Sequence, residues 1–153
     1  MSLDVSSIAT NVAALWSPAN VTAPTGLDNV SFSTHLLPNA IMATPCVLVK
    51  PPIGTFDYGP GALNGTLEFP TEFYLAESSD VTLNATKIYA WYATVLDKAR
   101  VNYDLDLTSS GVIDATITDT RVGTLQYGDP PKDYVGITFT VRVRLNLGYA
   151  ATT

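Results

Sequence analysis

The sequence has few charges and almost no reactive side chains. Only 14% of its 153 residues are charged, against about 25% in an average soluble domain, and it holds one cysteine and one histidine. A single cysteine cannot form an intrachain disulfide, which excludes a disulfide-stapled scaffold. One cysteine and one histidine also cannot supply the four ligands of a structural zinc site of the Cys/His type.

The charges that are present are mostly acidic. The chain has 14 Asp and Glu residues against 8 Lys and Arg, for a net charge of −6. Tight binding to nucleic acid comes mainly from Lys and Arg on phosphates, so this balance argues against it. Because 46% of the residues are hydrophobic, the chain is apolar enough to fold. The low charge fits either a neutral β-rich monomer or a chain that buries surface against its own copies.

No segment indicates a membrane span or a secretory signal. The N-terminus reads Met1-Ser2-Leu3-Asp4 and lacks a basic region followed by an apolar core. No apolar run approaches the ~20 residues that cross a bilayer. We therefore expect a protein that is made in the cytoplasm and has no membrane partner.

The length fits one domain, residues 1–153. Apolar residues recur every three or four positions from Val5 to Leu15, which predicts a short helix capped by Asp4 or Ser2. The apolar run at residues 45–49 predicts a strand that is buried on both faces.

Two long loops are expected, over about residues 18–44 and 51–65. The first lacks strong periodicity, and the second is dense in proline and glycine. The second also carries Phe56, Tyr58 and Leu63. Apolar side chains on such a loop form either a docking element or a small cluster that folds back on the domain.

The second half of the chain alternates between strand and helix patterns. A half-buried strand is expected at 66–76, with Pro70 at a bulge or an edge, followed by the longest helix at about 80–101. Two further strands are expected at about 112–126 and 134–147. The pattern predicts an α+β fold: an antiparallel or mixed sheet of about four or five strands, with a short N-terminal helix and one long helix packed on one face.

No recognisable motif supports catalysis. The sequence contains neither a phosphate-binding glycine loop nor a nucleophile elbow. His35 has no Ser or Cys placed beside it by a motif, so we interpret it as a loop or surface residue. Cys46 lies in the apolar run at 45–49, where a thiol behaves as a small hydrophobe.

The charged pairs can also be explained without catalysis or metal binding. Asp104 and Asp106 alternate along a short segment, but two carboxylates fall short of a calcium site, so a solvated strand edge is favoured. Arg142 and Arg144 share one face of the last strand, where they pair with acidic residues of a neighbouring strand or bind an acidic partner. We expect no enzymatic activity, no cofactor and no metal site.

The order of the elements and their residue patterns resemble those of a known family. The apolar strand Pro45-Cys46-Val47-Leu48-Val49 opens into a proline-rich loop, and the chain closes on the alternating segment Asp133-Tyr134-Val135-Gly136-Ile137-Thr138-Phe139-Thr140-Val141-Arg142-Val143. With the helix and strand between them, this pattern resembles the tail terminator proteins of long-tailed bacteriophages over about residues 4–147. Residues 18–44 and 53–63 do not match it.

The resemblance implies a structural virion protein at the head–tail interface. Such a protein forms a homohexameric ring that caps the tail tube, stops its polymerisation and docks the head-completion or connector proteins. DNA passes through the ring without tight binding. On this basis we expect ring or tube contacts from the segment 53–63 and the last strand, with Phe56, Tyr58, Leu63, Arg142 and Arg144 as candidate interface residues.

Other functions stay open. A head–tail connector or a tail tube subunit shares the same texture, and a tube subunit differs in polymerising openly. A small ligand- or carbohydrate-binding domain would instead use exposed aromatic rings as stacking platforms. The candidates for those platforms are Tyr58, Tyr74, Trp91 and Tyr127. An enzyme that uses His35 or the Asp104/Asp106 pair comes last.

Overall fold

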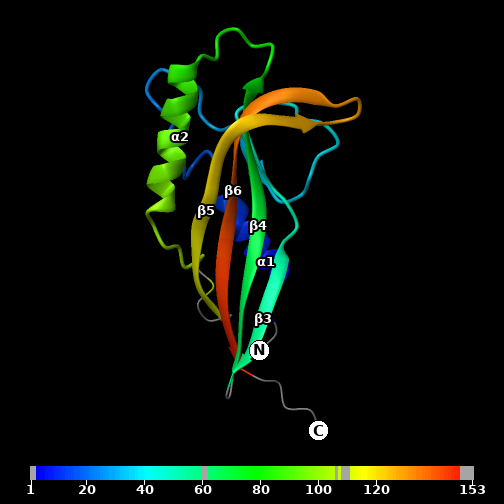
Figure 1. The fold of residues 1–153 in the computed structure, drawn as a ribbon, viewed down its shortest axis with the longest axis vertical. Coiled ribbons are helices and arrows are strands. Elements are labelled where there is room, and N and C mark those ends of the chain that lie inside the picture. The colour runs from blue at the N-terminus through cyan, green and yellow to red at the C-terminus, as the bar shows by residue number, and fades with distance from the viewer. Residues whose placement is uncertain (1–2, 60–61, 106, 108–110, 149–153) are drawn as a thin grey trace.

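The computed structural model describes residues 3–59, 62–105, 107 and 111–148 and shows an α+β fold (Figure 1). Six strands form one mixed sheet, and two helices contribute to the core on one of its faces. The strands are β1 (Phe32–Thr34), β2 (Cys46–Val49), β3 (Ile53–Gly59), β4 (Ala62–Glu77), β5 (Val112–Tyr127) and β6 (Lys132–Gly148). The helices are α1 (Val5–Ala14) and α2 (Ala85–Ala99). Among the residues described, neither helix is long and apolar enough to cross a membrane.

The sheet is built around two long central strands. Its order is β1-β2-β4-β6-β5, and β3 adds a further pairing to β4. β1 and β2 are parallel, and every other pair is antiparallel. The first part of β4 pairs with β3 and the later part with β2, so two shorter strands share one side of β4. The predicted four or five strands become six because the sequence patterns did not reveal β1 as a full strand or β3 at all.

Pro70 lies at the junction between those two shorter strands. The prediction of a bulge or an edge at Pro70 is wrong, because β4 is a central strand and its irregularity falls between Tyr74 and Ala76. The Pro70 carbonyl accepts a hydrogen bond from Lys50 N at 2.8 Å. A strand residue presents its N and O on the same side, so the proline nitrogen faces the link at residues 50–52. Proline has no backbone N–H, but at this position no hydrogen bond between paired strands is lost.

The main core lies on the helix-covered face. Alternate side chains of β4 and β6 point into it, and cross-strand partners such as Phe73 and Ile137 are fully buried. α1 contributes four buried residues and α2 contributes Trp91 and Val95. Trp16, which follows α1, lies against Phe139 with ring centroids 4.7 Å apart. In Figure 1, α2 runs alongside β5 while α1 crosses behind the sheet.

A second, smaller cluster lies on the opposite face. It joins Cys46 and Leu48 of β2 to Tyr74 and Tyr134. The loop before β2 covers this cluster, and the Tyr127 hydroxyl donates a hydrogen bond to the Pro38 carbonyl in that loop. Neither of the two described helices covers the rest of this face, so we call it the open face.

The helices follow their sequence signals with one displaced start. α1 is capped by Asp4, whose side chain accepts a hydrogen bond from Ser7 N at 3.1 Å. α2 begins later than predicted, after the cap residue Asn84, and the Asp80 side chain instead accepts from Thr82 N in a turn. Both are good cap residues. The helix begins after the second of these two residues, a few residues later than the predicted start.

The predicted long loop at 51–65 is wrong. Residues 53–59 are β3, and β4 extends back to Ala62, so this segment is mostly a hairpin. Two of its glycines leave room for the ring of Phe56: a Cβ on Gly65 would overlap this ring, and one on Gly54 would approach it to 2.8 Å. The other loop, 18–44, holds only the three-residue β1.

The strands of the last third agree with their periodicity. β5 and β6 cover the predicted ranges 112–126 and 134–147, and β2 is buried at all four positions. Along β6, Ile137 to Leu145 alternate between the buried core and the open face.

Candidate functional site

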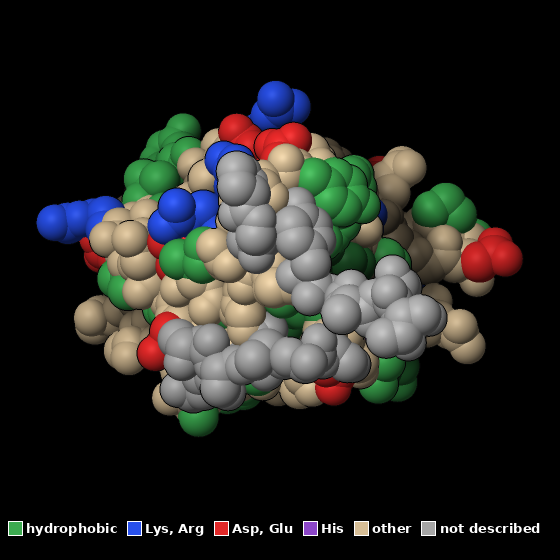
Figure 2. Space-filling model, turned by 90° about the horizontal axis from the view of Figure 1, so that it is seen from below, with side chains coloured by type: hydrophobic (Ala, Val, Ile, Leu, Met, Phe, Trp, Pro, Cys, Tyr) green, Lys and Arg blue, Asp and Glu red, His purple; other side chains and the backbone are tan. Residues whose placement is uncertain are grey.

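The β3–β4 hairpin carries the most exposed apolar side chains of the sheet. Six of the seven β3 residues are exposed. Ile53 is 64% exposed, Tyr58 80% and Phe56 41%. This hairpin reaches the lower end of the molecule in Figure 1, and Figure 2 looks onto that end, where charged side chains are few and form small mixed groups. A rigid strand, rather than a loop, therefore presents these residues.

Phe56 also lies at the outer end of a row of core residues that crosses the sheet. It pairs with Gly65, which pairs with Leu145 of β6, and Leu145 pairs with Val112 of β5. Leu145 and Val112 are buried, and Phe56 is the exposed end of the row. Tyr58 and the half-buried Leu63 form the next cross-strand pair. The ring of Phe56 folds over Gly65, as the fold-back interpretation predicts, and 41% of the residue stays exposed.

The predicted interface residues lie on two different faces. Phe56, Tyr58 and Leu63 share the helix-side face, whereas Arg142 and Arg144 lie on the open face of β6. Side chains that alternate along a strand point to opposite faces, so the structure does not join the five residues into one patch. The two groups lie on opposite faces of the part of the sheet that β3, β4, β6 and β5 form.

Arg144 pairs with an acidic residue of the neighbouring strand, as one of its two interpretations predicts. Its Nε and Nη2 donate to the two carboxylate oxygens of Asp114 at 2.7 and 2.5 Å. Hydrogen bonding to Arg144, followed by its charge, lowers the pKa of the Asp114 carboxyl. Arg142 lies opposite Glu68 of β4 and is exposed.

A shallow hollow of about 320 Å³ lies over these arginines. Thr55 and Asp57 of β3 line one side, and Arg142 and Arg144 line the floor. Ile113, 46% exposed, lines the side of β5. The hollow mixes one acidic and two basic side chains with threonines, so its chemistry suits polar contact with another protein surface more than enclosure of a small ligand.

The Asp114–Arg144 pair leads to a prediction about pH. The folded pKa of Asp114 is lowered, so the pair stabilises the fold above the unfolded carboxyl pKa of about 4 and loses this effect as the pH falls below it. We expect Asp114→Asn to cost up to about 1 kcal/mol at neutral pH, since half of the Arg144 side chain is exposed. Near pH 3 the cost should shrink. Urea unfolding at both pH values measures it.

Asp97→Asn is the matched control for this prediction. Asp97 faces Arg100 at 3.7 Å with both side chains largely in solvent, so its removal should change stability by less than about 0.5 kcal/mol. An Asp114→Asn cost that is the same at both pH values would contradict the assignment.

A compact polar group supports the smaller cluster. Lys50 Nζ lies 2.5 Å from a Glu72 carboxylate oxygen, and the Tyr74 hydroxyl donates to the same carboxylate. Burial, reinforced by Glu72, raises the pKa of Tyr74. Burial also raises the pKa of Cys46 to about 12. The thiol is therefore protonated at neutral pH, which agrees with its predicted role as a small hydrophobe.

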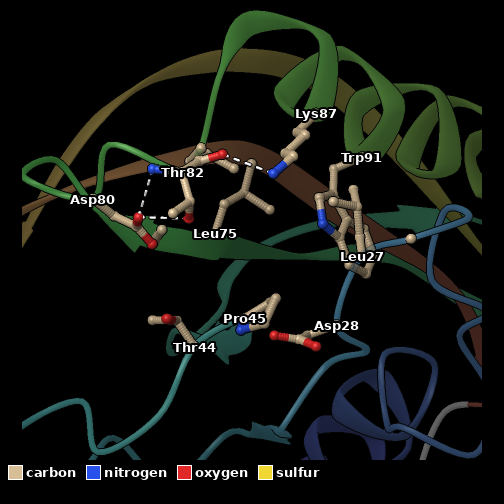
Figure 3. A pocket seen from close by; sticks show the side chains of 12 residues that line it. Leu27, Asp28, Thr44, Pro45, Leu75, Asp80, Thr82, Lys87 and Trp91 are labelled. Atoms are coloured by element: carbon tan, nitrogen blue, oxygen red, sulfur yellow. Dashed lines mark hydrogen bonds between the residues drawn. The ribbon is translucent and has the colours of Figure 1, made fainter.

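A cavity of about 180 Å³ lies between the β4–α2 connection and the loop before β2 (Figure 3). Two of its charged side chains serve the connection itself. Lys87 Nζ donates to the Thr82 carbonyl at 2.8 Å, and Asp80 accepts from the Thr82 backbone and hydroxyl. Trp91 closes one side, and Asp28 lines the cavity from the loop before β2. These contacts account for Lys87 and Asp80 as supports of the connection.

The structure removes two of the four proposed stacking platforms. Tyr74 is fully buried and Trp91 is 2% exposed, both against other aromatic rings. Tyr127 is half-buried and packs edge-on against Tyr74. Tyr58 is the one candidate that is largely exposed. Tyr74 and Trp91 are therefore too buried to serve as stacking platforms, whereas Tyr58 stays a candidate.

The structure places only some of the residues considered for catalysis or metal binding. His35 is half-buried directly after β1. Asp104 is exposed, and Asp106 lies outside the described residues. Within the described ranges, no three His, Cys, Asp or Glu side chains are grouped so that they could hold a metal. The sequence matches no model of a known protein family, and it matches no curated protein.

Proposed function

We propose that this protein is a structural virion protein of the tail terminator type. It closes into a homohexameric ring on the head-proximal end of a tail tube, ends tube polymerisation and docks the head-completion or connector protein. The β3–β4 hairpin is the observation that carries this proposal. A strand that exposes Ile53, Phe56 and Tyr58 at one end of a rigid sheet is suited to contact between subunits.

The composition supports the same function. A chain with 14% charged residues needs less charge for solubility if neighbouring copies cover part of its surface. The open face adds a polar region in which threonines of β5 and β6 lie around Arg142. Polar and apolar contact surfaces on the two sides of one sheet give each subunit distinct surfaces for distinct neighbours, as a heterologous ring requires.

The net charge of −6 suits a ring around DNA. Phosphates bind tightly where Lys and Arg neutralise them. An acidic subunit leaves DNA free to pass through the channel, as a terminator must. A DNA-packaging protein with a basic surface would instead hold the DNA.

Native mass spectrometry of the purified chain, followed by negative-stain microscopy, tests this function. We expect a closed hexamer of the 16.3 kDa subunit, seen end-on as six-fold rings. Open filaments would instead indicate a tail tube subunit. A monomer at micromolar concentration would contradict both, because each function needs self-association.

A further inference from the structure

We propose that Lys98 is a modification site: of the lysines in this chain, it is the one that small acyl phosphates acylate fastest. Lys98 lies in the last turn of α2 and lines a hollow of about 500 Å³, which we call the Lys98 hollow. This hollow lies between the ends of α1 and α2 and the segment that follows α2. The inference goes beyond the ring function and does not depend on it.

The four lysines of the chain differ in what holds their amines. Lys50 and Lys132 form ion pairs with glutamates, at 2.5 and 3.5 Å. An ion pair favours the ammonium form, which has no lone pair for attack on a carbonyl carbon. In the part of the chain that the structure describes, neither Lys87 nor Lys98 forms an ion pair.

Lys98 differs from Lys87 in the rings around its amine. Both lie on α2, and both donate one hydrogen bond to a backbone carbonyl, which for Lys98 is that of Asn20 at 3.1 Å. Lys98 Nζ also lies 5.3 Å from the ring centroid of Trp16 and 5.8 Å from that of Tyr103. Two rings at these distances keep water away from the amine, so its charge is less well solvated.

Burial lowers the pKa of the Lys98 amine. The rings also attract an ammonium group, but the loss of water has the larger effect and sets the direction. Among the charged groups nearby, Asp97 and Arg100 face each other at 3.7 Å, and Asp104 lines the Lys98 hollow. Burial also raises the pKa of Tyr103, which is therefore neutral at the same pH. A larger fraction of Lys98 than of an ordinary lysine is thus the free amine, which is the nucleophile.

The Lys98 hollow gives a small acyl donor room to reach this amine. In the reaction, the nitrogen lone pair attacks the carbonyl carbon of the acyl phosphate and forms a C–N bond. The bond from that carbon to the phosphate oxygen breaks, phosphate leaves with the electron pair, and the nitrogen releases one proton to water. The N–H of the amide product can still donate to the Asn20 carbonyl. Besides Lys98, the lining residues are Leu15, Asn20, Asn102, Tyr103, Asp104 and Leu105.

Partial acetylation followed by peptide mass spectrometry tests the site. The purified chain is treated with acetyl phosphate at about pH 8, where an ordinary lysine is almost fully protonated. We expect Lys98 to be acetylated at least about three times faster than Lys87, the matched control on the same helix. The rate at Lys98 should also stop rising at a pH below about 10.4, the ordinary pKa of lysine.

Unfolding separates the effect of the fold from that of the local sequence. In concentrated guanidinium chloride, Lys98 and Lys87 should react at similar rates, because the rings and the hollow are lost. A Lys98 rate no higher than that of Lys87 in the folded chain would overturn the proposal. An excess at Lys98 that persists in the unfolded chain would overturn it as well, since the local sequence would then be the cause.

Discussion

Replacing Trp91 with alanine is expected to lower the free energy of unfolding by about 3–5 kcal/mol, the usual loss for a buried tryptophan. Trp91 is 2% exposed, and its ring packs edge-to-face on Phe73 at 5.0 Å between centroids. With Val95 it is one of two fully buried side chains of α2. The variant therefore removes much of the contact that holds this helix to the sheet.

Equilibrium urea unfolding measures this loss. Tyr89→Ala is the matched control, because Tyr89 lies on the same helix and is 65% exposed. Its effect should stay near 0.5 kcal/mol. A Trp91→Ala loss below about 1 kcal/mol would mean that α2 does not depend on this ring, and would contradict the described packing.

Gly136→Ala is expected to destabilise the fold by about 1–3 kcal/mol or more, through overpacking between central strands. A Cβ on Gly136 would overlap the carbonyl oxygen of Phe73 and approach Leu125 Cδ1 to 2.6 Å. The Phe73 oxygen belongs to the backbone of β4, so it can move only if the β4–β6 ladder distorts.

Gly123→Ala is a close control for that variant. Gly123 is the cross-strand partner of Gly136 in β5, and a Cβ there would meet nothing within 4 Å. We expect it to be neutral or stabilising by up to about 1 kcal/mol, since alanine restricts the unfolded chain. Thermal unfolding of both variants gives the comparison. Equal losses would show that glycine is needed in this region for flexibility rather than for space.

Elements with a regular pattern of buried and exposed residues were predictable from the sequence. β6 alternates from Ile137 to Leu145, and α1 shows apolar spacing of three and four with a cap at Asp4. Both signals depend on one element facing one core. The pairing of Arg144 with an acidic neighbour was also foreseen as one alternative, because oppositely charged side chains stabilise adjacent strands.

β3 was missed because its composition imitates a loop. Its segment has glycines at 54, 59, 61 and 65 and prolines at 51, 52 and 60. The sequence still held a signal: aromatic residues at 56 and 58 alternate with small ones, and Gly-Pro-Gly at 59–61 separates them from a second alternating run. What no local pattern could show was that the ring of Phe56 would lie over Gly65 on the next strand.

Two of the stacking candidates are buried for a related reason. Trp91 lies within the predicted long helix, where a core position was the stronger interpretation, but only long-range packing places Tyr74 inside. Tyr74 is buried by β2 and by Tyr134, which lies 60 positions later in the chain. Contacts at such separations are invisible to periodicity.

The position of β6 between β4 and β5 has a consequence for how the chain acquires its fold. β6 is the last strand in sequence, yet it supplies one of the two pairing edges of β4 and pairs with β5 over nearly its whole length. That edge of β4 must wait for a partner that follows it by more than fifty residues, and pairings across such distances form slowly. During synthesis, the edges of β4 and β5 that β6 pairs with remain unpaired until residues 132–148 arrive. This interval is when the chain is most exposed to wrong strand partners.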